Sequence, residues 1–160
     1  MLSLYRLVIN IIFILSPLIL TIRLLKKTEH PKRFLEKLSF FTKKKLRGKL
    51  IWIHGASVGE LKSIVPILEK LEKDNSIKQI LLTSNTLSSV KIVSSFKFKK
   101  VTHQFFPIDT VYHTKKFLEY WDPSFSMFVD SEIWPNMIFN IKKREIPLIL
   151  INARITNKSF

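Results

Sequence analysis

Residues 51–71 read IWIHGASVGELKSIVPILEKL, and this stretch indicates how the chain folds. It opens with an uninterrupted apolar run, continues through a polar segment at 54–60, and ends with apolar residues at helical spacing. An unbroken apolar run is typical of a strand buried on both faces of a parallel sheet, and the later spacing is typical of an amphipathic helix. The helix face consists of Leu61, Ile64, Val65, Leu68 and Leu71. The stretch therefore predicts a buried strand, a loop and a helix.

The same pattern recurs along the rest of the chain. Apolar runs occupy residues 80–82, 127–129 and 148–151, with a weaker run at 101–106. A second helix face is formed by Trp134, Met137, Ile138 and Ile141. Strands that alternate with helices are joined as right-handed crossovers in a parallel sheet. Residues 50–160 are therefore predicted to form a Rossmann-like α/β domain, a parallel sheet with flanking helices.

An apolar segment, LVINIIFILSPLILTI at 7–22, lies near the N-terminus between Arg6 and Arg23. A helix that spans a bilayer needs about 20 apolar residues, so the segment is of marginal length unless the leucines on either side extend it. A cleaved signal peptide is the alternative, but no small-residue cleavage pattern follows and the chain continues with basic residues. We therefore expect residues 1–25 to be a single, retained membrane anchor.

The next segment, residues 26–49, is strongly basic, with Glu29 and Glu36 as its only acids. Under the positive-inside rule such a segment stays on the cytoplasmic side of the membrane. Apolar residues at helical spacing within 34–41 predict a helix that lies either on an anionic lipid surface or in a solvated linker. Anionic membrane lipids are therefore an expected partner.

Composition limits the partners further. The formal net charge of +15 points to an anionic partner, which could be nucleic acid, an acidic lipid surface or a phosphorylated substrate. The chain has no recognisable nucleic-acid-binding motif and carries much of its charge beside the predicted anchor, so we expect no nucleic acid. Cysteine is absent from the sequence, and the four histidines lack metal-ligand spacing. We therefore expect neither a metal nor a cofactor.

Polar residues that follow the predicted strands are the candidates for chemistry, because ligands of open parallel sheets bind beyond the carboxyl ends of the strands. The first such loop is HGASVGE at 54–60, in which Ser57 and Glu60 have the spacing of a capping box. Its structural interpretation is helix capping, and its functional interpretation is a carboxylate held at a helix start to accept a proton. One position could serve both purposes. The loop has neither a dinucleotide fingerprint nor a P-loop.

The later strands are followed by a second group of polar residues. Glu132 precedes Pro135, and is either an acid that interacts with a helix dipole or a second carboxylate at the sheet edge. Two carboxylates that converge on a cleft would also suit a glycoside hydrolase. Asn152 and Arg154 follow the last strand, where they could bind a phosphate or sugar oxygen or remain solvated.

Four of these segments, taken in order, resemble one known family. They are HGASVGE at 54–60, FFPID at 105–109, SEIWPN at 131–136 and NARITNKS at 152–159. Their order and spacing, together with the preceding anchor, resemble the signature of the bacterial Kdo transferases, where Kdo is 3-deoxy-D-manno-octulosonic acid. The resemblance covers essentially all 160 residues. One departure is that Glu36-Lys37 stands where the family often has Glu-Arg followed by glycine.

This resemblance implies a GT-B glycosyltransferase, built from two Rossmann-like domains, of which the chain is the N-terminal, acceptor-binding half. The family transfers Kdo from CMP-Kdo to lipid IVA in lipopolysaccharide biosynthesis at the bacterial inner membrane, with inversion and without a metal. Carried onto this sequence, Glu60 is implied as the general base. The residues implied to shape its loop or line the same cleft are Ser57, Gly59, Glu132, Asn152 and Arg154.

The resemblance also implies that CMP-Kdo binds a C-terminal domain that the 160 residues do not include. We therefore expect the chain to present the acceptor and the base, and to depend on a donor-binding domain supplied elsewhere. The alternative is a noncatalytic protein that binds lipid A precursors at the membrane surface, or an inactive truncated copy.

Overall fold

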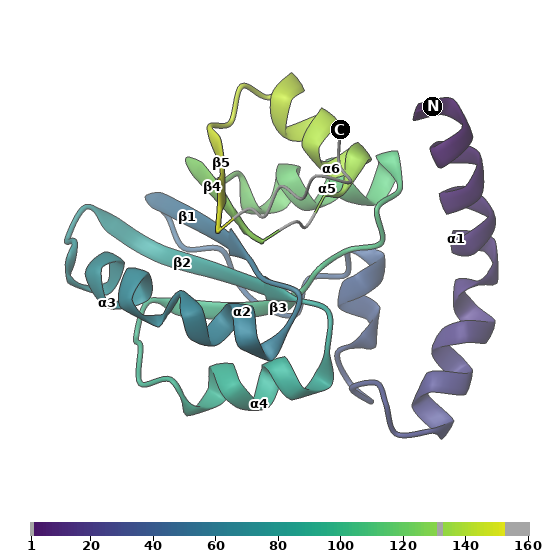
Figure 1. Ribbon diagram of the computed structural model, residues 1–160, viewed down its shortest axis with the longest axis horizontal. Helices are drawn as coiled ribbons and strands as arrows, with labels where there is room; N and C mark the ends of the chain where they lie inside the picture. Colours follow the sequence, from purple (N-terminus) through teal and green to yellow (C-terminus); the bar gives the residue numbers. More distant parts are fainter. Residues whose placement is uncertain (1, 131–132, 153–160) are drawn as a thin grey trace.

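Five parallel strands form a central sheet in the computed structural model, which describes residues 2–130 and 133–152 (Figure 1). The strands are β1 (Lys49–His54), β2 (Ile77–Ser84), β3 (Val101–Phe105), β4 (Phe125–Val129) and β5 (Leu148–Ile151). Their order across the sheet is β3-β2-β1-β4-β5, and every neighbouring pair is parallel. Each predicted apolar run is a strand, including the weak run that became β3. The predicted α/β fold is therefore confirmed.

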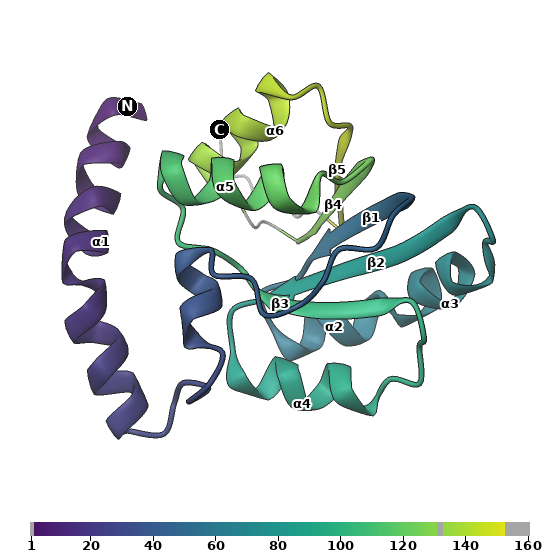
Figure 2. The same cartoon turned by 180° about the vertical axis from the view of Figure 1, so that it is seen from behind.

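Helices cover both faces of the sheet, as Figures 1 and 2 show from opposite sides. One face carries α2 (Val58–Ser63), α3 (Val65–Lys73) and α4 (Leu87–Ser95), and the other carries α5 (Val111–Trp121) and α6 (Pro135–Lys143). Successive residues of β1 point to opposite faces: Trp52 enters the core beneath α5 and α6, whereas Ile51 and Ile53 enter the core beneath α2, α3 and α4. Burial on both faces explains why the strands read as unbroken apolar runs.

The helices differ from the prediction in two respects. The predicted helix over 61–71 is interrupted at Ile64, because Pro66 lies in the first turn of α3 and cannot donate a backbone hydrogen bond to the turn before it. The spacing of apolar residues did not predict α4 and α5. Both begin at a threonine, Thr86 and Thr110, whose hydroxyl accepts a hydrogen bond from the backbone N–H three residues later.

The N-terminal residues form α1 (Leu2–Leu25), a long helix that lies beside the α/β domain (Figure 1). Its most apolar 18-residue window has a mean hydropathy of 2.3, and length and composition make it a candidate membrane segment. It extends beyond the predicted segment 7–22 at both ends because leucines flank that segment.

The basic segment that follows α1 packs against the sheet instead of forming the helix predicted over 34–41. Its only regular element is the short 3₁₀ helix η1 (Phe34–Leu38), which lies between α1 and the domain (Figure 2). The carboxylate of Glu36 is fully buried, receives two hydrogen bonds from Arg33 at 2.8 and 2.9 Å, and receives a third from the backbone N–H of Phe105 in β3 at 2.9 Å. This buried, fully hydrogen-bonded acid fixes the segment to the sheet, so the predicted surface or linker helix is wrong.

A second buried acid joins α1 to this segment. The carboxylate of Glu29 pairs with Lys37 at 2.6 Å and with Arg23 at 3.0 Å. Burial opposes the charge on Glu29, yet the hydrogen bonds and charges of Lys37 and Arg23 outweigh it and hold the pKa of Glu29 below its ordinary value.

Candidate functional site

The candidate site lies at the carboxyl end of β1, at the switch point of the sheet. From β1 the chain crosses to β2 on one side, whereas the other neighbour of β1 is β4, reached only later in the sequence. The loops that leave β1 and β4 therefore diverge, and in open parallel sheets ligands bind in the crevice opened in this way. The loop after β1 contains residues 55–57 and leads directly into α2.

Glu60 is held in this loop by short, local hydrogen bonds. One carboxylate oxygen, Oε2, accepts from the backbone N–H of Ala56 at 2.8 Å, and the other, Oε1, accepts from the hydroxyl of Ser57 at 2.6 Å. The Ser57 hydroxyl in turn accepts from the backbone N–H of Glu60 at 3.3 Å, which confirms the predicted N-cap. The Glu60 side chain is half-buried and Ser57 is exposed, so the carboxylate is positioned but not sealed within the protein.

The two glycines of the loop have different surroundings. A Cβ on Gly55 would lie 3.1 Å from Leu61 Cδ2 and 3.4 Å from Glu60 Cβ, so the absence of a side chain lets the helix start pack against the loop. A Cβ on Gly59 would meet only the Ser57 hydroxyl, at 3.9 Å. Gly55 therefore shapes the packed side of the loop, whereas Gly59 leaves its open side accessible. The prediction that Gly59 shapes a ligand site remains untested.

Beside this loop lies an aromatic cluster that the sequence did not identify as part of a site. The ring of His54, the last residue of β1, is 4.1 Å from the ring of Phe106 and 6.5 Å from that of Trp134, centroid to centroid. The Nδ1 atom of His54 is 3.0 Å from the Thr83 hydroxyl. The tilted and edge-on rings pack together where β1 passes into the loop that carries Glu60.

An open hollow of about 320 Å³ lies on the other side of this cluster. Phe106 and Trp134 line it from the sheet edge, and Ile9 and Ile12 line it from α1. Its walls are mainly apolar, with Lys37, Asn85 and Asp109 as the polar members. The hollow therefore brings the candidate membrane helix within reach of the edge of the sheet where the Glu60 loop begins.

Asp109 connects two of the four motifs, FFPID at 105–109 and SEIWPN at 131–136. Its carboxylate accepts hydrogen bonds from the backbone N–H groups of Asn136 at 3.0 Å and Met137 at 2.8 Å, and so caps α6 from a different loop. It also accepts from the hydroxyl of Tyr5 at 2.7 Å. Burial raises the pKa of Asp109 above its ordinary value, although these three hydrogen bonds oppose the rise. Asp109 therefore ties the loop after β3 to the start of α6.

Of the three remaining predicted site residues, the structure describes Asn152 alone. Asn152 is exposed at the end of β5, adopts a left-handed backbone conformation with φ of 57°, and donates its amide to Asp130 at 2.5 Å. It ties the ends of β4 and β5 together, two strands from the Glu60 loop. Glu132 and Arg154 lie outside the described residues. Within 2–130 and 133–152 no group of three or more histidine or acidic side chains is arranged to hold a metal ion.

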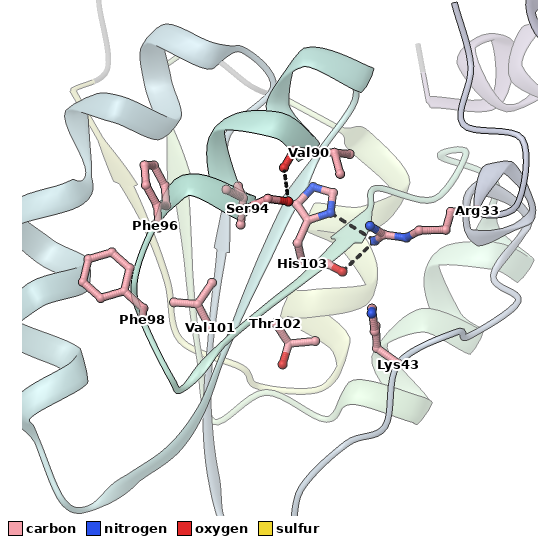
Figure 3. A pocket seen from close by; sticks show the side chains of 10 residues that line it. Arg33, Lys43, Val90, Ser94, Phe96, Phe98, Val101, Thr102 and His103 are labelled. Atoms are coloured by element: carbon pink, nitrogen blue, oxygen red, sulfur yellow. Dashed lines mark hydrogen bonds between the residues drawn. The ribbon is translucent and has the colours of Figure 1, made fainter. Parts of the chain in front are cut away.

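A second hollow, of about 300 Å³, lies beside the edge strand β3, between α4 and β3 (Figure 3). Arg33 and Lys43 stand at one side of it and Phe96 and Phe98 at the other. The histidine in its lining is His103, whose pKa is lowered to about 3 by burial and by nearby cations, so its ring binds a proton only weakly. The Glu60 loop is therefore the better candidate for proton transfer.

Comparison with known proteins identifies the relatives of the chain. The sequence profile of the family described as 3-deoxy-D-manno-octulosonic-acid transferase (kdotransferase) matches residues 32–160. The 3-deoxy-D-manno-octulosonic acid transferase of Rickettsia prowazekii is 46% identical over 111 residues, which cover 69% of the chain and 24% of the relative.

Longer alignments give the same assignment. The protein of the same name from Rickettsia bellii is 39% identical over 151 residues, which cover 92% of the chain and 36% of that protein. A probable mitochondrial 3-deoxy-D-manno-octulosonic acid transferase of Arabidopsis thaliana is 34% identical over 159 residues, covering 98% of the chain and 36% of that protein. The chain thus spans between about a quarter and about a third of the length of these relatives.

Proposed function

The chain belongs to the 3-deoxy-D-manno-octulosonic acid transferase family, and from this premise we propose that it is the acceptor-binding part of a glycosyltransferase that moves Kdo from CMP-Kdo to lipid IVA. In this proposal the chain presents the lipid-borne acceptor sugar, and CMP-Kdo is held by a second domain across the crevice. The domain division follows the same scheme: an anchor at 1–25, a basic segment at 26–49 and the acceptor-binding domain at 50–160.

The position of Glu60 is the observation that carries the proposal. Each oxygen of a carboxylate has two lone pairs, and each oxygen of Glu60 uses one of them within the loop. One lone pair on each oxygen is left for an acceptor hydroxyl that enters from the open side, next to Gly59. Glu60 then takes the hydroxyl proton as the acceptor oxygen forms a bond to the anomeric carbon of Kdo. The bond from that carbon to CMP breaks on the opposite face, so a single displacement inverts the configuration.

The surroundings of the loop suit an acceptor that is anchored in a membrane. The apolar hollow beside Phe106 and Trp134 opens between α1 and the sheet edge, and it offers apolar surface to the lipid part of the acceptor. The phosphates of the acceptor and the anionic leaflet are attracted by the basic residues at 26–49, which places the chain at the cytoplasmic face of the inner membrane. In this scheme Glu132, Asn152 and Arg154 line the far side of the crevice.

The test supplies a donor-binding part from a relative. The chain is expressed together with the part of the Rickettsia bellii protein that lies beyond the aligned residues, and Kdo transfer from CMP-Kdo to lipid IVA is followed. We expect transfer by the wild type and a loss of at least about 100-fold in Glu60→Gln, since general-base catalysis contributes roughly 100- to 10,000-fold. Glutamine preserves the capping-box pattern, so the fold is retained.

Glu69→Gln is the matched control, because Glu69 is an exposed acid on the neighbouring helix α3. It should transfer Kdo at the wild-type rate. Full activity in Glu60→Gln would remove Glu60 as the base. Binding of lipid IVA by the wild type without any transfer would instead assign the chain to the noncatalytic alternative.

A further inference from the structure

The two ends of α1 contact the same face of the α/β domain. At the N-terminal end, the Tyr5 hydroxyl donates to Asp109 at 2.7 Å, and the guanidinium of Arg6 donates to Asn136 at 3.0 Å. At the C-terminal end, Arg23 pairs with the buried carboxylate of Glu29 at 3.0 Å; Glu29 also accepts from Lys37, and Lys37 donates to the backbone carbonyl of Asn85, which follows β2 in the domain. The whole length of the helix is therefore held against the domain.

Between these ends, one stripe of α1 packs on the domain. Its members follow one another at alternating spacings of four and three residues, and all are partly or fully buried: Leu2, Arg6, Ile9, Phe13, Ser16, Leu20 and Arg23. This spacing is that of a helix docked lengthwise along a partner. In the middle of the stripe, the ring of Phe13 lies 4.8 Å from that of His113, at the start of α5.

Length makes these contacts incompatible with a helix that crosses the bilayer. From Tyr5 to Arg23 the helix advances about 27 Å, at about 1.5 Å per residue. The hydrocarbon core of a bilayer is about 30 Å thick. If α1 crossed it, the end that carries Tyr5 would lie on the opposite side of the membrane from the domain, out of reach of Asp109, because the Arg23 end is tied to the domain by the segment that follows it.

We propose that α1 is an in-plane membrane helix, which rests in one leaflet with both of its ends on the side of the domain. The surface that enters the lipid is the part of the helix facing away from the domain. Six of its apolar side chains are between 50% and 78% exposed: Leu4, Leu7, Ile11, Ile14, Leu18 and Leu25. An isolated in-plane helix needs a polar face toward water, and here the docked domain covers that side instead.

Charge identifies the partner as an anionic lipid surface and not a second apolar protein. Residues 2–25 contain no acid, and the chain beyond them continues into the basic segment. At the C-terminal end of α1, Arg23 and Lys27 face Lys91 of α4 across an open hollow of about 340 Å³. Lipid phosphates beside the helix would meet this cationic surface while acyl chains cover the leucine and isoleucine side chains.

The absence of cysteine allows a direct test with single-cysteine variants of the full chain. Ser3→Cys and Lys32→Cys report the two ends of α1, Leu15→Cys reports its exposed apolar side, and Lys99→Cys reports the domain. Each is produced in a bacterium and treated with a membrane-impermeant maleimide, either in spheroplasts or in inverted inner-membrane vesicles. We expect labelling of Ser3→Cys, Lys32→Cys and Lys99→Cys in the inverted vesicles only. Leu15→Cys should react only after detergent is added.

Three results would overturn the proposal. Labelling of Ser3→Cys only in spheroplasts, with Lys32→Cys labelled only in inverted vesicles, would show that α1 crosses the membrane. Equal reactivity of Leu15→Cys before and after detergent would show that this side is not in lipid. Recovery of the chain as soluble dimers would assign the apolar side to a second copy. None of these readouts involves Kdo transfer, so they are independent of the role of Glu60.

Discussion

Acidification should destabilise the domain through one buried ring, that of His103 in β3. Its Nδ1 atom lies 3.1 Å from a guanidinium nitrogen of Arg33 (Figure 3). Its Nε2 atom lies 2.8 Å from the Ser84 hydroxyl. Because Arg33 can only donate, Nδ1 accepts and the ring is neutral, with its proton on Nε2. Burial, followed by the charges of Arg33, Lys43 and His30, lowers the pKa of His103 from 6.5 to about 3.

The sign and size of the effect follow from proton linkage. The unfolded chain binds a proton at His103 below a pH of about 6.5, whereas the folded chain does not until much lower pH, so stability falls as the pH drops. Between pH 8 and pH 5 the loss is about 2 kcal/mol from this residue. That value depends mainly on the pKa in the unfolded chain, and it stays near 2 kcal/mol for any folded-state pKa below about 4.

Urea unfolding of the full chain in neutral detergent, followed by tryptophan fluorescence at pH 8 and pH 5, measures this loss. We expect the free energy of unfolding of His103→Gln to fall by about 2 kcal/mol less than that of the wild type between pH 8 and pH 5. His113→Gln is the control, because His113 is also buried and has a lowered pKa. This variant removes the contribution of His113 to the pH dependence of the free energy of unfolding and keeps the contribution of His103. The prediction would be refuted if the free energy of unfolding fell equally in His103→Gln and the wild type between pH 8 and pH 5. Titration of the His103 ring above pH 5, followed by NMR, would also refute it.

Two further predictions concern the loops around the candidate site. Gly55→Ala should lower the free energy of unfolding in urea by roughly 1 to 3 kcal/mol, because the added Cβ would crowd Leu61 and Glu60. Gly59→Ala should leave it unchanged or raise it by up to about 1 kcal/mol. The reverse order would contradict the geometry of the loop. Asp109→Asn should cost roughly 1 to 3 kcal/mol at pH 7, because an amide cannot accept from both buried N–H groups at the start of α6, and an unchanged unfolding midpoint would show that Asp109 does not cap that helix.

The sheet could be predicted from the sequence because each of its strands falls in an apolar run, which the burial of β1 and β2 on both faces explains, although β5 exposes Ile149 and Leu150. The helices were less predictable. Proline at position 66 can mark the start of a new helix, but the apolar face at 61–71 continues past it. That face therefore predicted one helix where two form. The starts of α4 and α5 are marked by Thr86 and Thr110, but threonine is common in loops, so a single threonine does not by itself predict a helix start.

Buried charge was the feature that sequence reasoning missed in the basic segment. Lysines on one side and apolar residues on the other predicted a surface or linker helix over 34–41. The conformation is instead decided by Glu36, which lies against a strand 69 residues away through the backbone of Phe105. A single acid among many cations gives no sign of this in a sequence window, because its partner in the sheet lies too far along the chain.

The same contrast separates the two parts of the candidate site. Within residues 2–130 and 133–152, the hydrogen bonds to the Glu60 carboxylate come from Ala56 and Ser57, at most four residues away, so the motif alone predicted that the carboxylate lies at the start of the helix. The apolar hollow beside it is assembled from α1, η1, the loops that follow β2 and β3, and the residue before α6, and is held by contacts such as that between Tyr5 and Asp109, 104 residues apart. Substitutions in the loop should therefore alter proton transfer without moving α1. Substitutions at Tyr5 or Asp109 should instead loosen α1 and change how the acceptor reaches an intact base.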